Sequence, residues 1–147
     1  MDSDLLANLV RIWREARANR LQFLTDLHSA EEDAAYLSRV VLPKNQVWIA
    51  EVDEAVVGYI AFENRWVNQL HVAPPFQGRG LGSQLLAIAK RCNRTLQLWG
   101  FEVNLPAIRF YEHQGFRTIE RTAGASNEAK RPDRRMQWDE KQMKRSR

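Results

Sequence analysis

Three glycines within five residues, Gly78, Gly80 and Gly82, join a strand-like segment to a helix-like segment. Residues 66–72 have the composition of a strand, and a Pro-Pro pair ends it because proline cannot donate to a sheet ladder. Residues 81–92 place five apolar side chains on one helical face: Leu81, Leu85, Ile88, Ala89 and Cys92. This order recurs at phosphate sites, since glycine lets the backbone approach a ligand and a helix N-terminus faces negative charge. The turn predicts an α/β fold with an anion site, although a tight connection without a ligand would use the same glycines.

Two other phosphate-binding loops do not fit the spacing. A dinucleotide loop has the pattern G-x-G-x-x-G, but Ser83 stands where its third glycine belongs. A nucleoside triphosphate loop needs Gly-Lys-Ser or Gly-Lys-Thr, whereas Gly82 is followed by Ser83 and Gln84. Both classes of loop are therefore excluded.

The N-terminal half is predicted to hold two helices and a hairpin. Helical spacing covers residues 4–17 after a cap at Ser3, and residues 30–41 between an N-cap at Ser29 and a stop at Pro43. A less regular segment around Phe23 separates them. Strands are expected over residues 46–52 and 56–63, with Asp53 and Glu54 as the hairpin turn.

The C-terminal half is predicted to continue the sheet. Residues 95–101 form a strand that the crossover helix makes parallel to residues 66–72. Asn104 caps a helix over residues 105–114, and Gly115 ends it with a left-handed residue. Residues 116–122 and 134–138 are the last two strands.

Length, cysteine content and hydropathy limit the setting. The 147 residues suit one domain that spans the whole chain. A single cysteine, Cys92, cannot form an intramolecular disulfide, and no run of about 20 apolar residues is present to cross a membrane. We therefore expect a cytoplasmic protein that neither spans a membrane nor carries a basic secretory leader.

The positive charge gathers at the C-terminus. The last 18 residues carry a net charge of +5, which leaves the remainder of the +4 chain nearly neutral at −1. Residues 139–147 are expected to be a frayed basic tail, because a charged chain terminus is usually solvated. No aromatic side chains interleave with its charges as they do on single-stranded nucleic-acid surfaces. Nucleic acid is thus not the expected partner.

Two motifs resemble the GNAT superfamily of acyl-CoA-dependent N-acyltransferases. Val72-x-Pro74-x-x-Gln77-Gly78-Arg79-Gly80-Leu81-Gly82-Ser83 is similar to its coenzyme A signature, Q/R-x-x-G-x-G/A. The second motif, Leu96 to Trp99 followed by Asn104-x-x-Ala107-x-x-Phe110-Tyr111-Glu112-x-x-Gly115-Phe116, resembles the next strand and helix of that superfamily. The resemblance spans residues 46–138 and implies a mixed central sheet with an antiparallel N-terminal half, a parallel central strand pair that opens as a V, and helices on both faces.

The resemblance also implies a binding mode for acetyl-CoA as cosubstrate, with no metal. The acetyl carbonyl and pantetheine arm would contact the backbone of Leu70, His71 and Val72. The pyrophosphate would contact the turn, and the second motif would complete the site; these residues are Gln77, Gly78, Arg79, Gly80, Leu81, Gly82, Ser83, Asn104, Ala107 and Tyr111. Asn104 could instead act only as a helix cap.

The implied reaction is direct attack of an amine on the thioester, which requires two proton transfers. The ammonium, with a pKa near ~10.4, must lose a proton, and the thiolate must gain one. By the resemblance Tyr111 is the general acid beside the leaving sulfur, although it could simply pack against Phe110 and Phe116. The family's usual glutamate is missing from residues 66–69, so Glu63, His71 or a water chain held by Asn68 or Gln69 are the candidate bases.

Two further departures bear on partners and activity. The family's first edge strand is missing before the first helix, so residues 46–52 would form an open sheet edge that a partner, such as a second copy, could cover. The missing glutamate leaves open a catalytically silent module that binds coenzyme A and acts through protein contacts. The acceptor amine is not identified; Trp13, Phe23, Tyr36 and the acidic Glu31, Glu32 and Asp33 could line its pocket.

Overall fold

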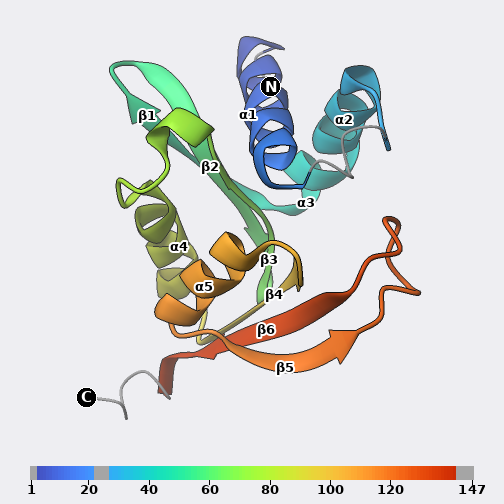
Figure 1. Ribbon diagram of the computed structural model, residues 1–147. Coiled ribbons are helices and arrows are strands. Elements are labelled where there is room, and N and C mark those ends of the chain that lie inside the picture. The colour runs from blue at the N-terminus through green and yellow to red at the C-terminus, as the bar shows by residue number, and fades with distance from the viewer. Residues whose placement is uncertain (1–2, 22–26, 142–147) are drawn as a thin grey trace.

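A six-stranded mixed sheet forms the centre of the molecule (Figure 1). The computed structural model describes residues 3–21 and 27–141. The strand order is β1-β2-β3-β4-β6-β5, and β3 with β4 is the parallel pair among otherwise antiparallel neighbours. The strands are β1 (Gln46–Val52), β2 (Ala55–Glu63), β3 (Trp66–Val72), β4 (Thr95–Phe101), β5 (Arg117–Thr122) and β6 (Asp133–Asp139). This arrangement confirms the predicted fold class.

The N-terminal helices follow the predicted positions with two differences at their ends. Helix α1 (Ser3–Arg20) includes Ser3 as a helical residue and continues three residues beyond Arg17. Helix α2 (Ala30–Tyr36) begins at a capping box in which the Ser29 hydroxyl accepts from Glu32 and the Glu32 carboxylate accepts from the Ser29 N–H. It continues through the π-helix η2 (Leu37–Val41) into α3 (Leu42–Lys44). Pro43 lies in the first turn of α3, where the missing N–H of a proline is tolerated, and the helical run continues one residue past it to Lys44, so the prediction that Pro43 ends the helix is wrong by one residue.

The first hairpin has the predicted turn. Asp53 and Glu54 both adopt positive φ, 50° and 68°, as a two-residue turn between twisted antiparallel strands requires. Strand β1 lies at the edge of the sheet, and no strand precedes α1 within the described residues. The expected open edge is therefore present in this part of the chain.

Helices cover both faces of the sheet (Figure 1). One core cluster joins β2, β3, β4 and β6 to Leu85, Leu86 and Ala89 of α4 and to Ile108 of α5. The other joins β2 to Leu9 and Ile12 of α1 and to Leu37 and Val41. Strand β2 serves both clusters by alternation, since Tyr59 and Ala61 face α1 while Ile60 and Phe62 face α4.

Strand β3 contains a β-bulge close to the point where it separates from β4. Val67 pairs with Phe62 and Gln69 pairs with Ala61, so Asn68 is the extra residue. The extra residue shifts the alternation, so Leu70 and Val72 join Val67 on the α4 face while Gln69 and His71 turn toward α1. Strand β3 pairs with β4 only at Trp66 and Gln97, and beyond this point the two strands diverge as the predicted V.

The second half builds one side of that opening. The 3-10 turn η3 (Pro74–Phe76) leads into α4 (Leu81–Cys92), and α5 (Leu105–His113) follows β4. At the end of α5 the N–H of Phe116 donates to Tyr111 and the N–H of Gly115, at φ 93°, donates to Glu112, which confirms the predicted glycine stop. Cys92, the last of the five side chains on the predicted apolar face, is the final residue of α4 and is exposed.

Strand β6 extends into the segment that was predicted to be a frayed tail. Asp139, predicted to begin the frayed tail, is the last residue of β6 and pairs with Thr95. The rest of that tail from residue 142, and the segment around Phe23, lie outside the described residues. None of the helices in residues 3–21 and 27–141 combines the length and apolarity that crossing a membrane would require.

Candidate active site

The glycine turn leaves the N-terminus of α4 uncovered. Gly78 and Gly80 have φ values of 79° and 85°, and Gly80 is the N-cap of α4 without any side-chain cap. A Cβ added to either glycine would meet no heavy atom within 4 Å. Because the first N–H groups of a helix have no partner within the helix, this end of α4 presents free donors and the positive end of the helix dipole. The local structure fits an anion such as a pyrophosphate.

Gln77 connects this turn to β3 and α1. Its Nε2 donates to the carbonyl oxygen of Val72 at 2.9 Å, and its Oε1 accepts from Nη2 of Arg20 at 2.7 Å. Arg79 lies over the ring of Phe76, with 5.2 Å from the guanidinium carbon to the ring centroid. The side chain of Gln77 thus positions the backbone, while the Arg79 guanidinium adds positive charge to the turn.

Helices α4 and α5 approach closely just behind the turn. A Cβ on Gly82 would lie 3.2 Å from Cζ of Phe110, so a larger residue would crowd the two helices. The hydroxyl of Ser83 accepts a hydrogen bond from Nε2 of Gln114 at 2.7 Å. The small size of Gly82 and the Ser83 hydrogen bond therefore allow α4 to lie close against α5.

Asn104 carries an unsatisfied polar atom near the open end of the V. Its backbone begins α5, since its carbonyl oxygen accepts from Ile108 at 3.1 Å. The side chain makes no capping hydrogen bond, and its Oδ1 is buried without a partner among the described residues. Asn104 is thus the N-cap by position but not by side chain, and a buried orphan acceptor is what an amide N–H of a ligand would satisfy. Ala107 follows within the first turn of α5, half-buried.

Tyr111 is held between two aromatic rings on α5 and the following turn. The ring centroids of Phe110 and Phe116 lie 5.4 Å and 5.6 Å from that of Tyr111, both in edge-on arrangements. Burial raises the pKa of the phenol to about 12, because the charged form would lose its hydration. The phenol is therefore a proton donor throughout the neutral range.

The two candidate bases lie near opposite ends of the β2–β3 pair, with Glu63 at the end of β2 and His71 near the end of β3. His71 is near the open end, where its ring stacks on Trp13 at 6.5 Å and meets Tyr59 at 5.7 Å. Burial, assisted by the charge of Arg17, lowers the pKa of His71 to about 4, so the imidazole is neutral at pH 7. Glu63 pairs with Trp66 at the closed end of the V. Trp66 is six residues before Val72, so Glu63 lies roughly 20 Å along the strand from the open end. The structure does not bring Glu63 to the other candidate residues.

The residues offered for a water chain are already engaged. The hydroxyl of Tyr59 donates to Oε1 of Gln69 at 2.6 Å. Nδ2 of Asn68 donates to Oδ1 of Asn45 at 2.8 Å on the surface. Of these two residues, only Gln69 lies on the same face of β3 as His71.

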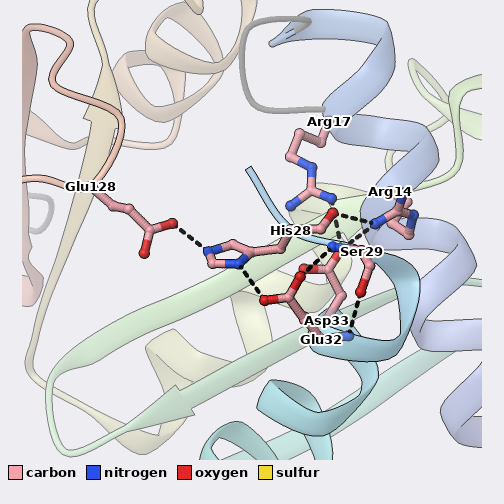
Figure 2. Close-up of polar contacts among 7 residues, drawn as sticks. All are labelled: Arg14, Arg17, His28, Ser29, Glu32, Asp33 and Glu128. Atoms are coloured by element: carbon pink, nitrogen blue, oxygen red, sulfur yellow. Dashed lines mark hydrogen bonds and ion pairs between the residues drawn. The ribbon is translucent and has the colours of Figure 1, made fainter. Parts of the chain in front are cut away.

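A buried ion cluster joins α1 to α2, and the sequence interpretation missed it (Figure 2). Arg14 and Arg17 both donate to Oδ2 of Asp33, at 2.6 Å and 2.7 Å. Asp33 is 2% exposed and Arg17 is 8% exposed. The expectation that Asp33 attracts a cationic amine is wrong, since two guanidinium groups already neutralise it. The signal was present in the sequence, because Arg17 follows Val10 and Trp13 on the apolar stripe of α1.

A second cluster of polar side chains joins α2 to the loop between β5 and β6 (Figure 2). Nε2 of His28 lies 2.5 Å from Oε1 of Glu128, and its Nδ1 lies 3.3 Å from Oε2 of Glu32. Hydrogen bonds to Glu128 and then Glu32 raise the pKa of His28. All three side chains are exposed to solvent.

Residues 43–118 match the family described as the acetyltransferase (GNAT) domain. The chain belongs to this family. The match confirms the predicted superfamily and the class of enzyme, an acyltransferase.

Individual relatives agree with this assignment. An uncharacterized N-acetyltransferase of Archaeoglobus fulgidus is 26% identical over 145 residues, which cover 86% of this chain and 96% of that protein. The peptidyl-lysine N-acetyltransferase YjaB of Salmonella typhimurium is 28% identical over 115 residues, 78% of each chain. The structure of yncA from Salmonella typhimurium, solved with its cofactor acetyl-CoA, shares the fold with a TM-score of 0.71 at 21% identity, covering 95% of this chain and 91% of that one.

Proposed function

We propose that this GNAT protein transfers the acetyl group of acetyl-CoA directly to a primary amine of a small molecule or a peptide. The uncapped N-terminus of α4 at Gly80 is the observation that carries the proposal, because its free N–H groups suit a pyrophosphate. The complex of yncA with acetyl-CoA supports the choice of ligand.

The chain offers matching groups for the rest of the cosubstrate. Beyond the Trp66 pairing, the edge of β3 that faces β4 has backbone groups free of β4, so Leu70, His71 and Val72 suit an amide-containing arm. The orphan Oδ1 of Asn104 would accept one N–H from that arm. Arg79 adds positive charge beside the phosphates. When bound, acetyl-CoA supplies an activated acyl carbon, and the protein residues orient it and move protons.

Tyr111 is proposed as the general acid. The amine nitrogen bonds to the acyl carbon, the C–S bond breaks, and the phenol O–H of Tyr111 protonates the departing sulfur. A phenol with a pKa of about 12 is fully protonated before the step. The nitrogen loses two protons in all, one from the ammonium before the attack and one as the amide forms. One of them restores the phenol of Tyr111 through solvent and the other is released to solvent, so the enzyme is restored.

His71 is proposed as the acceptor of the amine proton, directly or through one water. It is the candidate base at the open end of β3, and it is neutral at pH 7. Its low pKa makes it a weak base, so the ammonium would have to lose its proton in a site that disfavours positive charge. The nearby Arg17 guanidinium provides that electrostatic bias.

An assay of coenzyme A release over a panel of amines tests the proposal. Wild-type protein should release coenzyme A with at least one amine, and Tyr111→Phe should lower kcat about 100-fold or more while acetyl-CoA binding persists. Binding of acetyl-CoA without turnover of any amine would contradict the proposal and support the catalytically silent module.

We also propose the cellular setting of the protein and how it assembles. We expect one domain in the cytoplasm, where the exposed Cys92 would stay reduced. We also expect a homodimer that covers the edge of β1, where Trp48 is 48% exposed. Sedimentation of the wild type as a monomer would contradict the dimer.

A further inference from the structure

The ion cluster on α1 and α2 leaves positive charge and one donor unused. Arg14 and Arg17 share a single carboxylate oxygen of Asp33, so two positive charges face one negative charge. Nε of Arg17 is buried and has no hydrogen-bond partner among the described residues. An unpaired buried guanidinium donor costs free energy, and a ligand that accepts from it would recover that cost.

The unused donor lies near His71, the proposed acceptor of the amine proton. The Arg17 guanidinium carbon is 5.2 Å from the ring centroid of Trp13, and the same ring stacks on His71. The charge of Arg17 also acts on the imidazole of His71. One turn further along α1, Arg20 bonds to Gln77 of the coenzyme turn. Arg17 therefore sits on the α1 side of β3, opposite the face that holds Leu70 and Val72.

We infer that Arg17 is an anion subsite for the acceptor, which carries a carboxylate close to its reacting amine. This inference rests on the proposed acetyl transfer and names the class of acceptor for that site. Guanidinium groups pair with carboxylates through charge-assisted hydrogen bonds, and Arg17 is already oriented by Asp33. The Trp13 ring gives the same acceptor an apolar surface beside the charge.

Matched acceptors that differ in one group provide the test. One arm compares free amino acids with their carboxamides, such as glycine with glycinamide. The second arm compares lysyl peptides that carry Asp beside the lysine with peptides that carry Asn there. Acetyl-CoA binding is measured first on the same protein, so that a failure of the cosubstrate site is recognised separately.

Wild-type protein should acetylate the carboxylate member of a pair with a kcat/KM about 10-fold to 100-fold higher than its amide, by a lower KM. The arm that shows this preference identifies the source of the carboxylate. Equal rates for acids and amides would overturn the inference, and so would turnover of no carboxylate-bearing amine by protein that binds acetyl-CoA. Failure to bind acetyl-CoA would reject the proposed function and the inference with it.

Two variants separate binding from structure. Arg17→Gln should remove the preference by raising KM for the acid more than KM for the amide. It should also lower kcat for both acceptors, because the charge that favours loss of the ammonium proton is removed. Arg14→Gln removes the other partner of Asp33 and keeps the free Nε of Arg17, so it should keep the preference. Loss of the preference in Arg14→Gln alone would overturn the assignment to Arg17, and the comparison of wild-type rates stands even where a variant fails to fold.

Discussion

At the open end of the V, removing the Asn104 side chain should not lower the stability of the free protein but should weaken acetyl-CoA binding. Asn104→Ala removes a buried acceptor that has no partner and makes no capping bond. The free energy of unfolding without ligand should therefore stay level or rise, while the Kd for acetyl-CoA should rise about 10-fold. Calorimetric titration and urea unfolding measure the two quantities. A loss of about 1 kcal/mol in stability with unchanged affinity would instead identify Asn104 as a simple cap.

His71 should make the folded state sensitive to acid. Burial and then the charge of Arg17 hold its pKa at about 4, against 6.5 in the unfolded chain. Above pH 6.5 both states are neutral, and as the pH falls the unfolded state binds a proton first, so stability decreases. The wild type should lose about 2 kcal/mol more than His71→Gln between pH 7 and pH 5. Urea unfolding of both proteins at both pH values tests this, and equal losses would contradict it.

Sequence patterns predicted the position of these residues but not their contacts. The motifs placed Asn104 at a helix start and Tyr111 about two turns further along that helix, as the structure has them. They could not show that the Asn104 side chain lacks a capping bond, because this depends on its rotamer. They also could not show that Arg17 and Asp33 meet, because 16 residues separate them and the contact depends on how α1 packs against α2.

At the scale of elements, Gly58 allows β2 and β3 to approach each other closely. A Cβ there would lie 3.0 Å from the carbonyl oxygen of His71 and 3.3 Å from Cγ2 of Val72. Gly58→Ala should therefore cost about 1–3 kcal/mol and weaken acetyl-CoA binding, because it displaces the backbone at the proposed acyl site. Gly100→Ala is the control, since its Cβ would meet only the flexible end of Ile108. Equal effects of the two substitutions on binding would contradict the account.

The elements themselves were largely predictable, because strand and helix periodicities differ and prolines and glycines mark their ends. The bulge at Asn68 was not, since residues 66–72 have the same composition with or without an extra residue in the pairing. This bulge decides that His71 faces α1 and Leu70 faces α4. Local composition therefore predicted the strand, but the side chains that lie on each of its faces depend on how it pairs with β2.

At the scale of the whole molecule, His28 joins α2 to the loop that follows β5. Hydrogen bonds to Glu128 and Glu32 raise its pKa, so its contribution is complete below pH 6.5 and is lost as the pH rises through the raised value. Hydrogen-exchange protection of residues 123–132 should therefore be higher at pH 6 than at pH 8. His28→Gln should remove this difference. A wild-type loop with the same protection at both values would show that the contact does not hold it.

The central claim is that the N-terminal turn of α4 binds the pyrophosphate of acetyl-CoA. Its most direct test is calorimetric titration of acetyl-CoA into wild type, Gly80→Asp and Gly80→Asn. Asp and Asn both tolerate the positive φ of 85° and would project into open space, so the two variants differ in charge alone. The account predicts one-to-one binding by the wild type, a modest loss in Gly80→Asn and no measurable binding in Gly80→Asp. Equal affinities of Gly80→Asp and Gly80→Asn, or no binding by folded wild type, would contradict it.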